Sequence, residues 1–170
     1  GDGKCWMGLI GFGAIRYDRA DGSFEVYSDL PDFSELPYTS TIDAIIKRSV
    51  TSEICFGTYS RGLWLYDVEN HSVRALNSLI NKKIPSDVIN TLYEDSSGNI
   101  WAGTRAGAFI LTPDDDVISP SDLLPGKDLS VLDTEILGIC DDSMGNIWLA
   151  TMHSGIVRLN MSEKDVSVYY

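Results

Sequence analysis

The stretch VINTLYEDSSGNIWAGT, residues 88–104, decides the fold because a similar stretch returns 47 residues later. It aligns without a gap on EILGICDDSMGNIWLAT, residues 135–151, so that Trp101 matches Trp148. An earlier pair, KCWMGLIGFGAIRYD (4–18) and EICFGTYSRGLWLYD (53–67), repeats in the same frame. Self-similarity at a fixed period of this length is typical of repeat architectures. The chain therefore contains four copies of one unit.

Each copy reads as short strands separated by turn residues, and helical periodicity is missing nearly everywhere. In the third copy, residues 88–93, 100–104 and 108–111 are the expected strands, and residues 95–99 form a turn. A weaker fourth strand is expected at residues 24–27, 73–76, 117–118 and 166–170 of the four copies. We name the strands of a copy A, B, C and D in chain order.

Four-stranded sheets of this size cannot bury both faces until neighbouring sheets stack on them. We therefore predict an all-β fold, a partial β-propeller of about four blades that forms a single domain over residues 1–170. The first blade is expected to lack its strand A. The blades are expected at about residues 1–30, 38–78, 86–121 and 133–170.

Small residues inside the strands indicate close packing between copies. Gly8, Gly57 and Gly103 fall in mid-strand, where another backbone or a bulky ring such as that of Trp101 or Trp148 is expected to come close. The three cysteines are widely spaced within apolar runs, which predicts small core side chains and leaves their redox state open. They are Cys5, Cys55 and Cys140.

Composition excludes several classes of partner. Thirteen basic and 25 acidic side chains give a formal net charge of −12, without a basic cluster. No nucleic acid partner and no direct membrane contact by this segment are therefore predicted. No apolar run reaches the length of a membrane helix, and the start of the chain carries no secretion signal, so we expect a segment of a longer protein. An open arc of blades exposes apolar faces and edges, which predicts association with a second copy or with further blades.

Three segments resemble the two-component regulator propeller repeat: GNIWAGTRAGAFIL (98–111), GNIWLATMHSGIVRLN (145–160) and FGTYSRGLWLYD (56–67). The resemblance is weaker in the first copy and in the second, where SVTSE (49–53) replaces the expected turn of an acidic residue, glycine and asparagine. The family usually closes rings of about seven blades, so the resemblance implies part of one ring.

The resemblance also carries a functional expectation. Proteins with such repeats are typically extracytoplasmic sensor regions of hybrid histidine kinase and response regulator proteins that respond to glycan fragments. It implies a periplasmic, non-enzymatic segment of an inner-membrane protein that recognises a glycan or oligosaccharide. The signal would then pass to a downstream histidine kinase.

Candidate ligand-binding residues follow from the loop positions. If strand A is innermost, as in the family, the B–C loops and the D–A segments share one rim, and rigid strands hold them there. Tyrosine rings stack on sugar faces, and guanidinium groups bind carboxylate or sulfate. The candidates are Tyr59, Arg61, Arg105, His153 and Tyr38.

Catalytic and metal sites find less support. His71 and His153 are expected on opposite rims, where they cannot share a metal or a triad. The run 114–116 lacks the spacing of a calcium loop and is expected to be a solvated turn. No metal or cofactor is predicted. Two alternatives stay open: a lyase of the virginiamycin-hydrolysing type with His153 as its base, and a protein-interaction scaffold that binds no small molecule.

Overall fold

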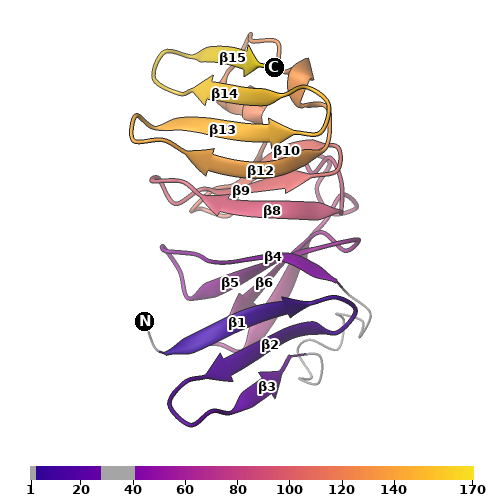
Figure 1. The fold of residues 1–170 in the computed structure, drawn as a ribbon, viewed down its shortest axis with the longest axis vertical. Coiled ribbons are helices and arrows are strands. Elements are labelled where there is room, and N and C mark those ends of the chain that lie inside the picture. Colours follow the sequence, from indigo (N-terminus) through magenta and orange to yellow (C-terminus); the bar gives the residue numbers. More distant parts are fainter. Residues whose placement is uncertain (1–2, 28–40) are drawn as a thin grey trace.

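The computed structural model describes residues 3–27 and 41–170, which form four antiparallel sheets stacked one after another (Figure 1). The first sheet has strands β1 (Lys4–Leu9), β2 (Gly13–Asp18) and β3 (Phe24–Val26). The second has β4 (Ile42–Lys47), β5 (Glu53–Thr58), β6 (Leu63–Asp67) and β7 (Ser72–Leu76). The third has β8 (Ile89–Glu94), β9 (Ile100–Thr104), β10 (Gly107–Leu111) and β11 (Val117–Ile118). The fourth has β12 (Ile136–Asp141), β13 (Asn146–Thr151), β14 (Ile156–Asn160) and β15 (Asp165–Tyr169).

The sheets repeat one plan, which confirms the predicted all-β propeller fold. Strands that follow each other in the chain pair in antiparallel order within every sheet. Strands β4, β8 and β12 occupy position A, and β4 contacts β8 as β8 contacts β12. Two short helices, α1 (Pro120–Leu123) and a 3₁₀ turn (Ser130–Leu132), lie in the connection between the third and fourth sheets.

Each junction between sheets places an isoleucine on a glycine. A Cβ atom added to Gly57 would lie 2.7 Å from Cγ2 of Ile89, and one added to Gly103 would lie 2.8 Å from Cγ2 of Ile136. Gly8 meets Ile42 in the same way. The expectation of a close approach at these glycines holds, but the partner is the first residue of the next strand A rather than a tryptophan ring.

The rings of Trp6 and Trp101 lie in cores between sheets. Trp101 is buried between the third and fourth sheets. Trp6, in the first sheet, packs on Phe56 and Tyr66 of the second, with ring centroids 5.5 and 5.8 Å apart. These cores join neighbouring sheets, as expected for sheets that cannot bury their own faces.

The prediction for the cysteines is wrong at two of the three positions. Cys55 is buried, and this burial raises the pKa of its thiol to about 12. Cys5 and Cys140 are exposed, because they lie on the outer faces of the first and last sheets, which no other sheet of the described residues covers. Within the described ranges, no helix has the length and apolarity needed to cross a bilayer.

The A–B turns of the third and fourth sheets bind the tryptophan that follows. Asp95 accepts a hydrogen bond from Nε1 of Trp101 at 2.9 Å, and Asp142 accepts one from Nε1 of Trp148 at 2.8 Å. Hydrogen bonds from Asn146 and Trp148 hold the pKa of Asp142 well below its usual range. The turn aspartate therefore fixes the indole at the end of each of these sheets.

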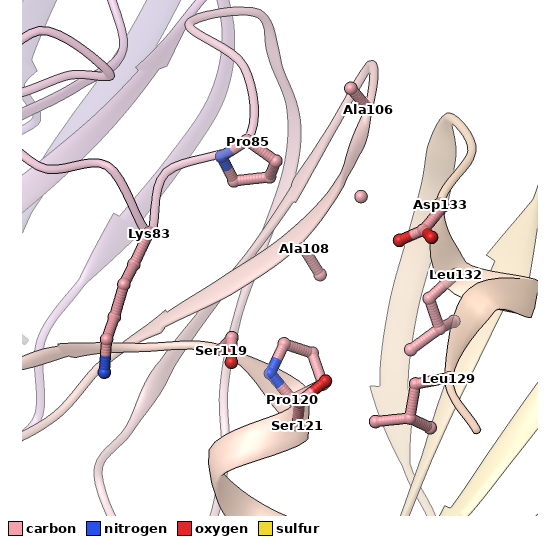
Figure 2. A pocket seen from close by; sticks show the side chains of 11 residues that line it. Lys83, Pro85, Ala106, Ala108, Ser119, Pro120, Ser121, Leu129, Leu132 and Asp133 are labelled. Atoms are coloured by element: carbon pink, nitrogen blue, oxygen red, sulfur yellow. The ribbon is translucent and has the colours of Figure 1, made fainter. Parts of the chain in front are cut away.

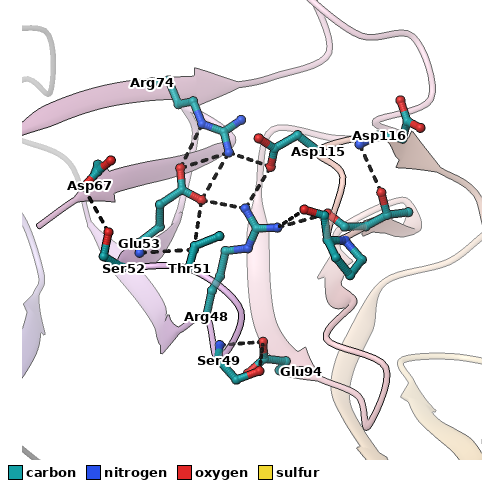
Figure 3. A network of polar contacts seen from close by, with 12 residues as sticks. Arg48, Ser49, Thr51, Ser52, Glu53, Asp67, Arg74, Glu94, Asp115 and Asp116 are labelled. Atoms are coloured by element: carbon teal, nitrogen blue, oxygen red, sulfur yellow. Dashed lines mark hydrogen bonds and ion pairs between the residues drawn. The ribbon is translucent and has the colours of Figure 1, made fainter. Parts of the chain in front are cut away.

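The second sheet lacks this turn and has an ion-pair network instead (Figure 3). The fully buried Arg48 pairs with Glu53 and, at 2.8 Å, with Asp115 of the third sheet's C–D turn. Arg74 contacts the same two carboxylates. Arg48 also donates to the Thr112 carbonyl at 3.0 Å. The sequence predicted that Asp115 lies in a solvated turn. The structure shows that Asp115 also forms a contact between the second and third sheets.

Candidate ligand-binding rim

A threonine hydroxyl shapes the B–C loop in three of the four sheets. Thr58, Thr104 and Thr151 each donate a hydrogen bond of 2.8 Å to the carbonyl of the glycine that closes the loop. Each hydroxyl also accepts a hydrogen bond from a backbone amide of the loop. The amide nitrogen of Arg61, for example, lies 2.9 Å from Oγ1 of Thr58. The loop conformation is therefore set from below, by residues at the end of strand B.

The first residue of each of these loops also forms a backbone hydrogen bond with the segment that leads into strand A. The amide of Tyr59 donates to the carbonyl of Thr41 at 3.0 Å, and that of Arg105 to Val88 at 3.1 Å. The amide of Met152 donates to Glu135 at 2.8 Å. The B–C loops and the ends of the D–A segments consequently lie at one end of the sheets, on the right in Figure 1.

Tyr59 and Arg105 meet across the junction between the second and third sheets. The Arg105 guanidinium carbon lies 5.5 Å from the centroid of the Tyr59 ring, and Nη2 lies 3.4 Å from the phenol oxygen. The hydrogen bond to Tyr59 raises the pKa of Arg105. A cation over an aromatic face is an attractive contact. The structure thus combines two predicted residues into one composite surface, with Tyr59 still 51% exposed.

The other predicted residues lie apart from this pair. Arg61 is exposed in the same loop as Tyr59 and lines a separate hollow of about 590 Å³ together with Trp64, Leu79 and Ile80. His153 is exposed in the B–C loop of the fourth sheet, and within residues 3–27 and 41–170 its ring forms no hydrogen bond or ion pair. Tyr38 lies outside the described residues.

A cavity of about 150 Å³ opens at the same rim, between the third sheet and the segment that leads to the fourth (Figure 2). Its floor is apolar and its two sides carry opposite charges, Lys83 and Asp133, with serine hydroxyls between them (Figure 2). The apolar lining comes from Pro85, Ala106, Gly107, Ala108, Pro120, Leu129 and Leu132.

The charged side of this cavity is held by the start of α1. Nζ of Lys83 lies 3.0 Å from Asp122, which also accepts the amide and hydroxyl hydrogens of Ser119. These bonds, the Ser119 amide first, lower the pKa of Asp122 to about 2. The Lys83 ammonium is therefore held against the start of α1, while its side chain remains half-exposed.

Sequence reasoning missed two parts of the rim. The loop threonines recur at a spacing of 46 or 47 residues, from Thr58 to Thr104 and to Thr151, so the repeat alignment contained that signal. The cavity wall from α1 had only the local signal of Ser119, Pro120 and Asp122, a helix-start pattern. Among the described residues, no group of three or more His, Cys, Asp or Glu side chains is placed to hold a metal ion.

Comparison with known proteins supports the repeat assignment. The sequence model of the family described as two component regulator propeller matches residues 83–106. These residues run from the D–A segment through β8 and β9 to the B–C loop of the third sheet. A search of curated protein sequences finds no significant match to the chain.

Solved structures share the fold at low sequence identity. The extracellular domain of a hybrid two component system from B. thetaiotaomicron is 21% identical with a TM-score of 0.76, over 98% of this chain and 22% of that chain. PorZ, a surface component of the type-IX secretion system of Porphyromonas gingivalis, is 16% identical with a TM-score of 0.71, over 98% of this chain and 26% of that chain.

A third match is an enzyme. A catalytically inactive virginiamycin B lyase from Staphylococcus aureus, with quinupristin, is 16% identical with a TM-score of 0.65, over 99% of this chain and 52% of that chain. The chain thus spans about a quarter of the length of the first two matched structures and about half of the third. Its residues 83–106, which match the two component regulator propeller model, lie within four successive blades of a β-propeller.

Proposed function

We propose that this chain is part of the extracytoplasmic, ligand-sensing propeller of a hybrid two-component sensor, and that its B–C and D–A rim recognises a glycan or oligosaccharide. A downstream histidine kinase would receive the signal. The Tyr59–Arg105 contact carries the proposal, because it joins two adjacent sheets and presents an exposed aromatic ring beside a fixed positive charge.

The chemistry of this surface suits a sugar with an acidic substituent. The exposed Tyr59 ring offers an apolar face, and the Arg105 guanidinium offers donors to a carboxylate or sulfate. The rigid backbone links of both loops keep these groups in place without a ligand. A preorganised contact of this kind lowers the entropy lost on binding.

Calorimetric titration with neutral, uronic-acid and sulfated oligosaccharides tests the proposal. Tyr59→Ala, alone and together with Arg61→Ala, and Arg105→Ala should each weaken binding by about tenfold, the effect of losing one hot-spot contact. Ser96→Ala is the matched control, because Ser96 is exposed in the A–B turn at the opposite rim. Unchanged affinity in the Tyr59 and Arg105 variants would remove this rim from consideration.

A lyase is the second candidate, because the fold matches virginiamycin B lyase and His153 is exposed on the rim. A general base usually needs a partner that orients its ring, and no such contact to His153 occurs in the described parts of the chain. Turnover of a streptogramin such as quinupristin that disappears in His153→Ala would favour the lyase. Binding of oligosaccharides without turnover would favour the sensor, and neither activity would favour a scaffold.

A further inference from the structure

The connection between β11 and β12, residues 119–135, folds into a wall that faces the third sheet (Figure 2). It buries Leu129 and Leu132 in the core between the third and fourth sheets. The amides of Leu132 and Asp133 donate hydrogen bonds to the carbonyls of Leu129 and Ser130 at 2.8 and 3.0 Å. Packing and backbone hydrogen bonds therefore fix this side of the cavity of about 150 Å³ at the rim.

Gly107, on the side of the third sheet, leaves the cavity open. Its φ of 122° lies in the region that favours glycine. A Cβ atom added to Gly107 would lie 3.4 Å from the carbonyl oxygen of Leu132 and 3.5 Å from Cγ of Pro85, which are ordinary contact distances. The space between these two residues can thus hold an atom of a ligand, because glycine places no side chain there.

The lining of this cavity is mostly apolar. Its apolar side chains are those of Pro85, Ala106, Ala108, Pro120, Leu129 and Leu132. An apolar cavity of about this volume in a protein can hold a molecule of benzene. An apolar ring or chain of about six carbon atoms therefore suits the volume and the lining.

Two charged residues line the cavity, Lys83 and Asp133. Nζ of Lys83 lies 3.0 Å from Oδ2 of Asp122, so its charge is already balanced. The carboxylate of Asp133 is exposed, and within residues 3–27 and 41–170 it forms no hydrogen bond or ion pair. In Figure 2, Asp133 stands on the same side of the cavity as Leu129 and Leu132. A positive charge on the ligand would therefore complement this site, and the net charge of −12 also attracts cations.

We infer that this cavity binds a small amphipathic cation, an amine that carries an apolar ring or chain of about six carbon atoms. The apolar part lies against the prolines, alanines and leucines, and the ammonium group pairs with Asp133. The lining residues include neither Tyr59 nor Arg105, so this site is separate from the proposed glycan contact.

Titration of the full chain with benzylamine, followed by NMR of the backbone amides, tests the inference. Benzylamine is protonated at pH 7 and should cause saturable shifts at Ala106, Gly107 and Leu132, with a millimolar dissociation constant typical of a small fragment. Benzyl alcohol has the same ring without the charge and should bind about fivefold more weakly, the effect of losing one exposed ion pair. Benzoate, with the opposite charge, should not saturate the site.

Variants of the chain identify the two parts of the site. Asp133→Asn should weaken benzylamine binding about fivefold and leave benzyl alcohol binding unchanged. Asp128→Asn is the matched control, because Asp128 is exposed in the same connection but does not line the cavity. Ala108→Leu should fill the cavity and abolish binding of both probes; circular dichroism checks its fold, and the Asp133 comparison stands without it.

Four results would overturn the inference. They are no saturable shifts with benzylamine, shifts confined to residues away from the cavity, equal affinity for benzylamine and benzyl alcohol, and equal effects of Asp133→Asn and Asp128→Asn.

Discussion

At the scale of single residues, the contact between glycine and isoleucine explains why the strands tolerate glycine. A glycine in a strand weakens it, unless another group needs the space above the backbone. Ile42, Ile89 and Ile136 occupy that space at the three junctions. The fourth copy has Ala150 at the glycine position, where the described residues place no isoleucine and the methyl group is exposed.

The substitution Gly57→Ala should lower the free energy of unfolding by about 2 kcal/mol, because the new methyl group overlaps Cγ2 of Ile89. Gly138→Ala is the control and should change stability by less than about 0.5 kcal/mol, since its Cβ would meet its nearest neighbour, the Cβ of Ala150, at an ordinary 3.8 Å. Urea unfolding followed by tryptophan fluorescence measures both. Equal effects at the two glycines would contradict the overlap.

The sequence could show that Gly57 and Gly103 mark close approaches, because both interrupt apolar strand positions. It could not show what approaches them, since Ile89 and Ile136 lie more than 30 residues further along the chain. Tyr59 and Arg105 were likewise separate candidates in sequence, and only the folded junction brings them together.

At the scale of strands and turns, the second sheet shows how one copy can depart from the repeat and keep its junction. Arg48 takes the place of the turn aspartate and reaches Asp115 in the neighbouring sheet. Burial alone would lower the pKa of Arg48, but the hydrogen bonds that Arg48 donates to Asp115 and Glu53 hold its pKa above the usual range. The alignment of the repeats predicted the strands. It could not predict this network, because Arg48 contacts Asp115 and Thr112, which lie 67 and 64 residues further along the chain.

We expect Arg48→Met to destabilise the chain by about 3 kcal/mol, because it leaves Glu53 and Asp115 short of a partner next to a core. Arg74→Met removes a positive charge that pairs with the same two carboxylates. Because Arg74 is 37% exposed, this variant should lower the free energy of unfolding by less than about 1 kcal/mol. Chemical unfolding of the two variants under identical salt compares them. A larger loss in the Arg74 variant would show that the buried arginine is not the main contact.

At the scale of the whole molecule, the outer face of the last sheet repeats a surface that the first sheet buries. Trp148, Arg158 and Tyr169 stand 142 positions after Trp6, Arg16 and Tyr27. In the first sheet this trio faces the second sheet, with Arg16 over Trp6 at 5.9 Å; in the last sheet Arg158 lies over Trp148 at 6.0 Å. The outer face of the fourth sheet therefore carries the same residues as a junction between sheets, but no further sheet of the described residues covers it.

This exposed face should make the chain associate with itself, or with further blades when these are present. Sedimentation velocity at increasing micromolar concentrations should show a shift from monomer to larger species. Trp148→Lys should shift the distribution to monomer, whereas Ser96→Lys, on the A–B turn of the third copy, should not. A wild-type chain that stays monomeric up to about 100 μM would contradict this expectation.

The recurrence of one junction bears on how such proteins evolve. Because Ile42, Ile89 and Ile136 meet the preceding glycine in the same manner, a unit gained or lost by recombination between tandem gene segments would still find a matching neighbour on each side. Natural selection can therefore alter the loops of one unit, as with Tyr59 or Arg105, while the interlocking of the units persists unchanged.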